Sequence, residues 1–293
     1  MDVVDAVVTA MPAEVGELYA DQHSIIDELF ITTADDNYVT ARWCFHRNLN
    51  VDFFWLAVHC VEKYLKAVLL LNGRPAKNFG HDINQLYAEV LKVAGDLLPP
   101  GPVKPERMPP SMWREETFEQ FIGRLYRDGQ ADNRYQLYGY SKMPEDLWKL
   151  DQLVFNIRRL CRPLDASVMK TNIASGPNIS HRDSLKENPK RWTLHSRLED
   201  ALEGKIDEEV KAAATLWNFP FTPENYPRPA ASYTLASRDS VFIRRLFDPL
   251  RAGPEHFAKS DKLWAWVKTH IRLPKELINE IEAEREQLKS AQP

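Results

Sequence analysis

The stretch His59–Gly73, HCVEKYLKAVLLLNG, decides how this chain folds. Its polar side chains, His59, Glu62, Lys63 and Lys66, are related by spacings of three and four residues, and on a helix they lie along one face. In the longer run Asp52–Gly73, DFFWLAVHCVEKYLKAVLLLNG, the other directions are occupied by Phe, Trp, Leu, Val, Tyr and Ala. A helix that is apolar on nearly every side is buried, so we expect it to be the central member of a bundle.

The polar face has two interpretations. The simpler one is a narrow solvated edge, on which Glu62 and Lys66 form an i,i+4 ion pair worth a few tenths of a kcal/mol. The other is the wall of a site that includes His81 from the following segment, GHDINQLY. Asp82 and Gln85 predict a capping box there, and His81 either packs on the first helical turn or joins the helix amides in an anion-binding corner.

The rest of the sequence also shows mainly helical patterns. Apolar residues recur at helical spacing in the segments 13–30, 35–48, 52–71, 83–94, 115–127, 145–161, 194–217, 239–250, 256–270 and 274–290. The predicted buried faces include Ile83, Leu86, Tyr87 and Val90 in one segment, and Leu147, Leu150, Val154 and Ile157 in another. Because strand-like alternation is absent from the sequence, we expect an all-α fold.

Composition changes along the chain predict its organisation. Residues 164–192 are rich in Ser, Asn, Lys and Pro, which is typical of a linker or a long surface loop. We therefore expect a helical bundle over 13–163 and a helical C-terminal region over 193–293. That region is interpreted either as a small second domain or as an extension wrapped on the bundle.

Charge and cysteine content narrow the function classes. The net charge of −4 and the pI of about 6.1 give no global attraction to nucleic acid, so any such surface is local. The three cysteines have no CxxC spacing, which favours a reducing cytoplasm over disulfides or structural zinc. The acidic N-terminal segment does not resemble a secretion signal, and charges interrupt the longest apolar stretch, so we expect no membrane span.

An ordered series of residues resembles a known family, the HEPN domains. The series consists of Glu62-Lys63, Lys66-Ala67, Gly73, His81-Asp82, Leu86 and a later Arg134-Tyr135. The resemblance covers about residues 13–163 and leaves the C-terminal region unassigned. It implies an antiparallel bundle of four or five helices, and it implies a homodimer.

The resemblance also implies a range of functions. Many members of the family are metal-independent endoribonucleases with an R-x4–6-H motif, in which Arg stabilises the phosphate and His acts as acid or base. Other members are binding or partner modules, often beside a nucleotidyltransferase. For this chain the resemblance therefore implies a nucleotidyltransferase or antitoxin partner in a stress or defence system, and no cofactor.

This sequence departs from the family at the catalytic motif. Arg134 is followed by YQLYGYSKMP, which has no His within six residues. Tyr138 and Tyr140 occupy the places where the His is expected, and a tyrosine that titrates near pH 10 is a poor general base at neutral pH. The spacing from Arg42 to His46 is too short and lies on another helix. We therefore expect a module without the standard ribonuclease motif.

The expected ligand is a nucleotide or single-stranded RNA, bound by cationic groups and aromatic faces. The expected ligand-binding residues are His59, Glu62, Lys63, Lys66, His81, Asp82, Arg134, Tyr135 and Tyr138. Two alternatives remain open. One is an endoribonuclease in which His59, His81 or His46 replaces the missing His, and the other is a helical dimerisation scaffold. The aromatic loop around Arg134 also has a plain interpretation, as a loop packed on the protein.

Overall fold

The chain divides into two units, which are described separately. The computed structural model describes residues 23, 26–76, 79–105, 108–168, 179–187, 235–237, 241–270 and 274–291. Unit 1 comprises Met1–Gly129 and Met143–Thr234, and unit 2 comprises Gln130–Lys142 and Leu235–Pro293. Both units are built mainly of helices, which confirms the predicted all-α class. Among the described residues no helix is both long enough and apolar enough to cross a membrane.

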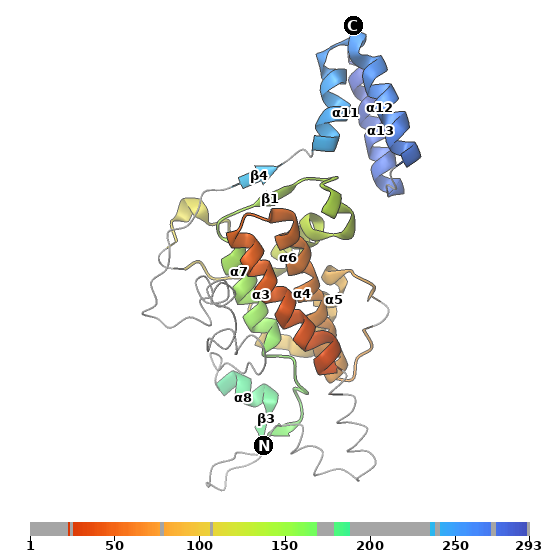
Figure 1. Ribbon diagram of the computed structural model, residues 1–293. Coiled ribbons are helices and arrows are strands. Elements are labelled where there is room, and N and C mark those ends of the chain that lie inside the picture. Colours follow the sequence, from red (N-terminus) through yellow and green to blue (C-terminus); the bar gives the residue numbers. More distant parts are fainter. Residues whose placement is uncertain are drawn as a thin grey trace. The chain divides into compact units, whose positions relative to one another are not determined.

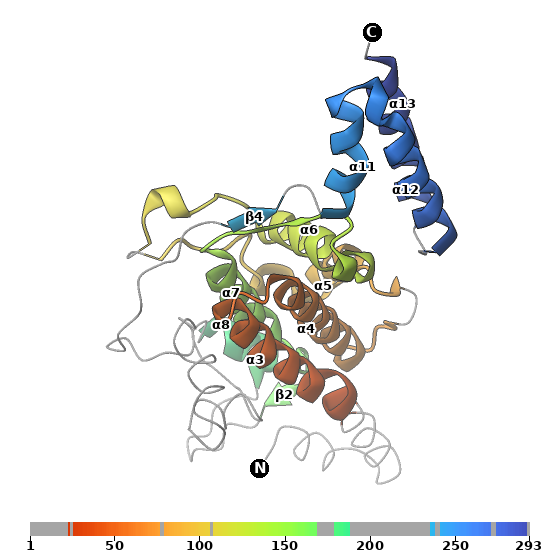
Figure 2. The ribbon, with the colours of Figure 1, turned by 45° about the horizontal axis from the view of Figure 1, so that its top comes forward.

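Unit 1 is a helical bundle around one central helix. Its main helices are α3 (Thr33–His46), α4 (Asn50–Leu71), α5 (Ile83–Ala94), α6 (Phe118–Gly129) and α7 (Asp146–Arg158). In Figures 1 and 2, α4 lies between α3 and α5, and it contacts α3, α5, α6 and α7. The polar-striped segment is therefore the central helix, as its apolar surroundings predict. Short 3-10 segments, Gly95–Leu97 and Pro110–Met112, lie in the connection from α5 to α6.

The predicted buried faces of these helices form the core of unit 1. Ile83, Leu86, Val90, Leu147, Leu150, Val154 and Ile157 are all fully buried, and Tyr87 is 3% exposed. Helix α6 begins with a reciprocal capping box, because the Gln120 backbone N–H donates to Thr117 Oγ1 and the Thr117 N–H donates to Gln120 Oε1. The capping box places the start of α6 at Phe118, three residues after the start of the predicted segment 115–127.

A close approach between α4 and α6 depends on a glycine. A Cβ atom at Gly129 would lie 2.3 Å from the Phe54 carbonyl oxygen and 2.6 Å from Val58 Cγ2. Neither the backbone nor the tightly packed valine has room to move, so only glycine fits at this crossing. Gly123, one and a half turns earlier on α6, has its nearest neighbour at 3.6 Å, which is ordinary contact.

Buried ion pairs join α3 and α7 across the bundle. Arg158 Nε donates to Asp35 Oδ1 at 2.9 Å, and Tyr64 of α4 also donates to that carboxylate. About two turns away, Arg42 and Tyr38 both donate to Asp151, whose side chain is fully buried. Breaking one member of such a pair leaves a buried charge, so these residues set how α3 and α7 align.

The predicted linker over 164–192 contains ordered structure where it is described. Strands β2 (Ser167–Val168) and β3 (Ile179–Ser180) pair antiparallel, and helix α8 (His181–Glu187) follows. Arg182 of α8 donates to the carbonyl oxygens of Val93 and Ala94 at the end of α5. This segment is therefore attached to the bundle rather than being a plain spacer.

Unit 2 combines the connection between α6 and α7 with the C-terminal helices. Strand β1 (Tyr140–Lys142) pairs antiparallel with β4 (Leu235–Ser237). The helices are α11 (Val241–Ala252), α12 (Phe257–His270) and α13 (Lys275–Ser290), with a 3-10 turn at Pro254–His256 before α12. Leu137 from the connection lies in one core cluster with Leu246, Phe247, Leu250, Trp264, Leu277 and Ile281. A boundary at 164–192 alone does not describe this division, because residues 130–142 belong with the C-terminal helices.

Two of the predicted helices fall on residues that are largely outside the described ranges. They are 194–217 and most of 13–30. At the end of the predicted segment 13–30, Asp27–Thr32 forms a π-helix that leads into α3. The predicted segments 239–250, 256–270 and 274–290 correspond to α11, α12 and α13, apart from shifts of one or two residues at their ends.

Candidate functional site

The buried carboxylate of Glu62 is the centre of the candidate site. Lys66 Nζ lies 2.6 Å from Glu62 Oε1, His81 Nδ1 lies 3.1 Å from each carboxylate oxygen, and His59 Nδ1 lies 3.6 Å from Oε2. The Glu62 side chain is 6% exposed, whereas the His81 side chain is 81% exposed. Four of the residues predicted from the sequence therefore converge, with a buried acid at the base and an imidazole at the surface.

Helix geometry and a hydrogen-bonded loop together produce this convergence. His59, Glu62 and Lys66 follow one another at i, i+3 and i+7 on α4, which places them on one face. Lys66 Nζ also donates to the Gly80 carbonyl at 2.7 Å, which holds the loop before α5 against α4. His81 follows Gly80 directly, so this contact brings its ring to the carboxylate.

Asp82 caps helix α5. Its Oδ1 accepts from the backbone N–H groups of Asn84 at 3.0 Å and Gln85 at 3.2 Å. The Gln85 side chain donates to Asp82 Oδ2 at 2.8 Å, so the predicted capping box forms with a side-chain contact in place of the usual backbone one. The Asp82 carboxylate thus occupies two of the amides at this helix start.

The surroundings of Glu62 keep it ionised. Burial by itself raises the pKa of this carboxyl, but the contacts with His59, Lys66 and His81 outweigh burial and lower the pKa to about 2. A carboxylate accepts and never donates, so the nitrogen of His81 that faces it carries a hydrogen. In the neutral ring the lone pair is then on Nε2, and Glu62 fixes both the tautomer and the orientation of His81.

The two histidines lie side by side at this centre. The ring centroids of His59 and His81 are 6.5 Å apart, and the ring of Trp55 contacts His59 edge to face with centroids 4.0 Å apart. Each histidine presents Nδ1 to Glu62. Such an arrangement offers two acid–base groups and one cation, Lys66, around a single anchored carboxylate.

Lys63 belongs to a different contact. Its Nζ donates to Asn37 Oδ1 at 2.6 Å and to the Thr33 carbonyl at 3.4 Å, both at the start of α3. Burial lowers the pKa of Lys63. Since neighbouring helical residues point about 100° apart, Lys63 supports the α3–α4 contact while Glu62 supports the α4–α5 loop.

Arg134, Tyr135 and Tyr138 belong to unit 2, in the connection that contains the 3-10 turn Ala131–Tyr135. Tyr135 is 73% exposed, and the Arg134 guanidinium lies 5.9 Å from the centre of its ring. Tyr138 is half-buried against the unit 2 core, so the plain interpretation of this loop applies to it. Burial, followed by the charges of Asp132, Glu280 and Glu276, raises the pKa of Tyr138.

A hydrogen-bonded asparagine shapes this loop. Asn133 Nδ2 donates to the Gly139 carbonyl at 2.6 Å, and Asn133 Oδ1 accepts from the Tyr138 N–H at 3.1 Å. Arg134 Nε donates to the Ala131 carbonyl at 3.0 Å. Tyr135 is therefore displayed on an ordered loop, while Leu137 anchors the loop in the core.

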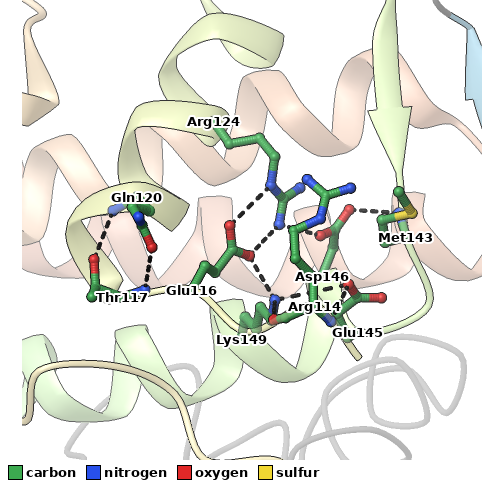
Figure 3. A network of polar contacts seen from close by, with 9 residues as sticks. All are labelled: Arg114, Glu116, Thr117, Gln120, Arg124, Met143, Glu145, Asp146 and Lys149. Carbon is green, nitrogen blue, oxygen red and sulfur yellow. Dashed lines mark hydrogen bonds and ion pairs between the residues drawn. The ribbon is translucent and has the colours of Figure 1, made fainter. Parts of the chain in front are cut away.

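A second polar network, shown in Figure 3, is absent from the sequence-based prediction. Glu116 Oε1 lies 2.7 Å from Arg124 Nη2 and 2.6 Å from Lys149 Nζ, and Arg124 Nη2 also lies 2.7 Å from Asp146 Oδ1. Burial raises the pKa of Asp146 despite the nearby Arg124. The segment before α6 is tied to α7 by this network, since Lys149 also donates to the Arg114 carbonyl at 2.6 Å.

A signal for this network exists in the sequence. Arg124 lies between Phe121 and Leu125 on the apolar face of α6, and Lys149 lies among the leucines of α7. A charged residue on an apolar face requires an opposite charge, because unpaired buried charges are costly. The partner cannot be read from spacing, since Glu116 and Lys149 are 33 residues apart.

Within the described ranges, no group of three His, Cys, Asp or Glu side chains is arranged to hold a metal ion. The three cysteines, Cys44, Cys60 and Cys161, are buried. No protein-family model, curated protein or solved structure matches this chain.

Proposed function

We propose that unit 1 is a HEPN-type bundle that binds a nucleotide or single-stranded RNA at the Glu62 centre, as a module of a stress or defence system without the standard ribonuclease motif. One observation carries the proposal. His81, distant in sequence from the polar stripe of α4, meets His59 and Lys66 on one buried carboxylate. A plain solvated helix edge does not require contacts from the loop before α5, such as those of Gly80 and His81.

The chemistry of the centre suits a phosphate-bearing ligand. Glu62 is a single negative charge, and Lys66 balances it, so protonation of either imidazole makes the surface cationic. The Trp55 and His59 rings add faces for stacking a base. A nucleotidyltransferase or antitoxin partner and a homodimer remain part of this proposal, as implied by the family resemblance.

A titration tests the binding proposal. The full-length protein is titrated with mononucleotides and short RNA oligomers at moderate salt, followed by calorimetry. We expect His81→Gln to weaken binding several-fold, because it removes a cationic donor at the surface. His256→Gln is the matched control, since His256 is also exposed but lies in unit 2. Absence of binding to the unsubstituted protein at millimolar ligand rejects the proposal.

A second candidate function is metal-independent RNA cleavage, and the 6.5 Å spacing of the His59 and His81 rings favours it. One imidazole, in its neutral form, would take the proton of a ribose 2′-hydroxyl, whose oxygen attacks the phosphorus. The other imidazole, in its protonated form, would give its proton to the 5′-oxygen as the bond between phosphorus and that oxygen breaks. Incubation with total RNA, beside His81→Ala and His59→Ala, tests this candidate. Intact RNA with the unsubstituted protein, or equal cleavage by all three proteins, rejects it.

A further inference from the structure

We propose that His81 is a phosphoryl-acceptor site, at which Nε2 takes a phosphoryl group from an acyl phosphate. This inference goes beyond the proposed binding function, because it concerns a covalent product on the protein itself. Two observations lead to it. The His81 side chain is 81% exposed, and its Nδ1 lies 3.1 Å from both oxygens of a carboxylate that is only 6% exposed.

The buried carboxylate makes Nε2 the nucleophilic atom. Glu62 accepts a hydrogen bond from Nδ1, so the neutral ring has its lone pair on Nε2, at the opposite side of the ring. When Nε2 forms a new bond, positive charge develops on the imidazole. Glu62 lies against the ring and stabilises that charge without moving, which is the role of a preorganised anion beside a nucleophile.

The neighbouring charges suit a phosphoryl group. Lys66 Nζ is held 2.6 Å from Glu62 and 2.7 Å from the Gly80 carbonyl, next to the acceptor residue. The adjacent acid, Asp82, is bonded to the α5 amides of Asn84 and Gln85, which stabilises its charge within the helix start. The acceptor ring is therefore held by a carboxylate, with an ammonium group beside it.

The step conserves atoms and electrons. The Nε2 lone pair forms the nitrogen–phosphorus bond, and the bond between phosphorus and the acyl oxygen breaks. The carboxylate of the donor leaves with that electron pair. The hydrogen on Nδ1 stays in place, and Glu62 balances the charge of the phosphorylated ring.

Acetyl phosphate is the probe for the test, applied to the full-length protein, with peptide mass spectrometry to locate acid-labile phosphoryl groups. His256 is the internal comparator, because it is half-exposed and its Nε2 lies 3.5 Å from the exposed carboxylate of Glu255. We expect His81 to be modified at least about tenfold faster than His256, the factor expected from one charge-assisted hydrogen bond.

Two further measurements keep the test independent of protein stability. Glu62→Gln should bring the rate ratio of His81 to His256 close to one, and urea should do the same for the unsubstituted protein. Equal rates in the native protein overturn the proposal, as does modification at His59 instead of His81. An unchanged ratio in Glu62→Gln also overturns it. Nucleotide or RNA binding is measured separately, so failure of one proposal leaves the other distinguishable.

Discussion

Replacing Glu62 by Gln tests whether the ionised carboxylate stabilises unit 1. The amide keeps the size of the side chain but removes its charge, so it resembles the protonated acid. A pKa lowered from 4.5 to about 2 corresponds to about 3 kcal/mol in favour of the ionised form, at about 1.4 kcal/mol per pKa unit. We therefore expect Glu62→Gln to lower the free energy of unfolding of unit 1 by about 3 kcal/mol at pH 7.

The stabilisation by Glu62 should depend on pH, in the direction set by its lowered pKa. Because the pKa in the folded protein lies below that of the unfolded chain, the stabilisation is complete above about pH 5 and disappears as the pH falls toward 2. The difference between the unsubstituted protein and Glu62→Gln should therefore shrink over that range. Urea unfolding by circular dichroism measures it, and hydrogen exchange of α4 peptides reports unit 1 separately from unit 2.

The matched control is Glu89→Gln on α5. Glu89 pairs with Lys92 at the surface, where both side chains are well exposed, so its removal should cost less than about 1 kcal/mol. Equal stability of Glu62→Gln and the unsubstituted protein at pH 7 would refute the reasoning. A loss of the same size in Glu89→Gln would refute it as well, since the effect would then reflect net charge alone.

Three further tests, two of them with a companion substitution, concern the packing. Gly129→Ala should destabilise unit 1 by about 2 kcal/mol or more, because the new methyl group meets the α4 backbone. Gly123→Ala is the control and should be neutral or stabilising by up to about 1 kcal/mol. Thermal unfolding compares the two variants. Arg158→Met should cost about 3–5 kcal/mol in urea unfolding by leaving Asp35 buried without its cation, and adding Asp35→Asn should recover part of the loss. Leu137→Ala should lower the free energy of unfolding of unit 2 by about 2–4 kcal/mol, because this loop residue lies in the core of the C-terminal helices. Limited proteolysis of the variant should therefore cleave unit 2 first, and cleavage that starts in unit 1 contradicts the prediction.

The sequence by itself determined the helices of the described ranges and the central position of α4. Apolar spacing is a local property, so the faces that contain Ile83 or Leu147 could be read directly and are buried as predicted. Only the part of the candidate site that lies on α4 could be predicted from the sequence. His59, Glu62 and Lys66 share a helix face by geometry, and their meeting with His81 depends on a loop contact that spacing alone does not encode.

Spacing predicts the Glu62–Lys66 pair within α4, but only the tertiary structure decided which charges pair between segments and which segments share a core. Lys63 lies one residue from Glu62 yet contacts α3, and Arg124 finds Glu116 and Asp146 through the packing of α6 on α7. The placement of Leu137 among helices more than a hundred residues later is equally invisible to local periodicity. Ion pairs and core contacts depend on distances between segments, which a single sequence does not contain, whereas helix formation depends on neighbours three and four residues away.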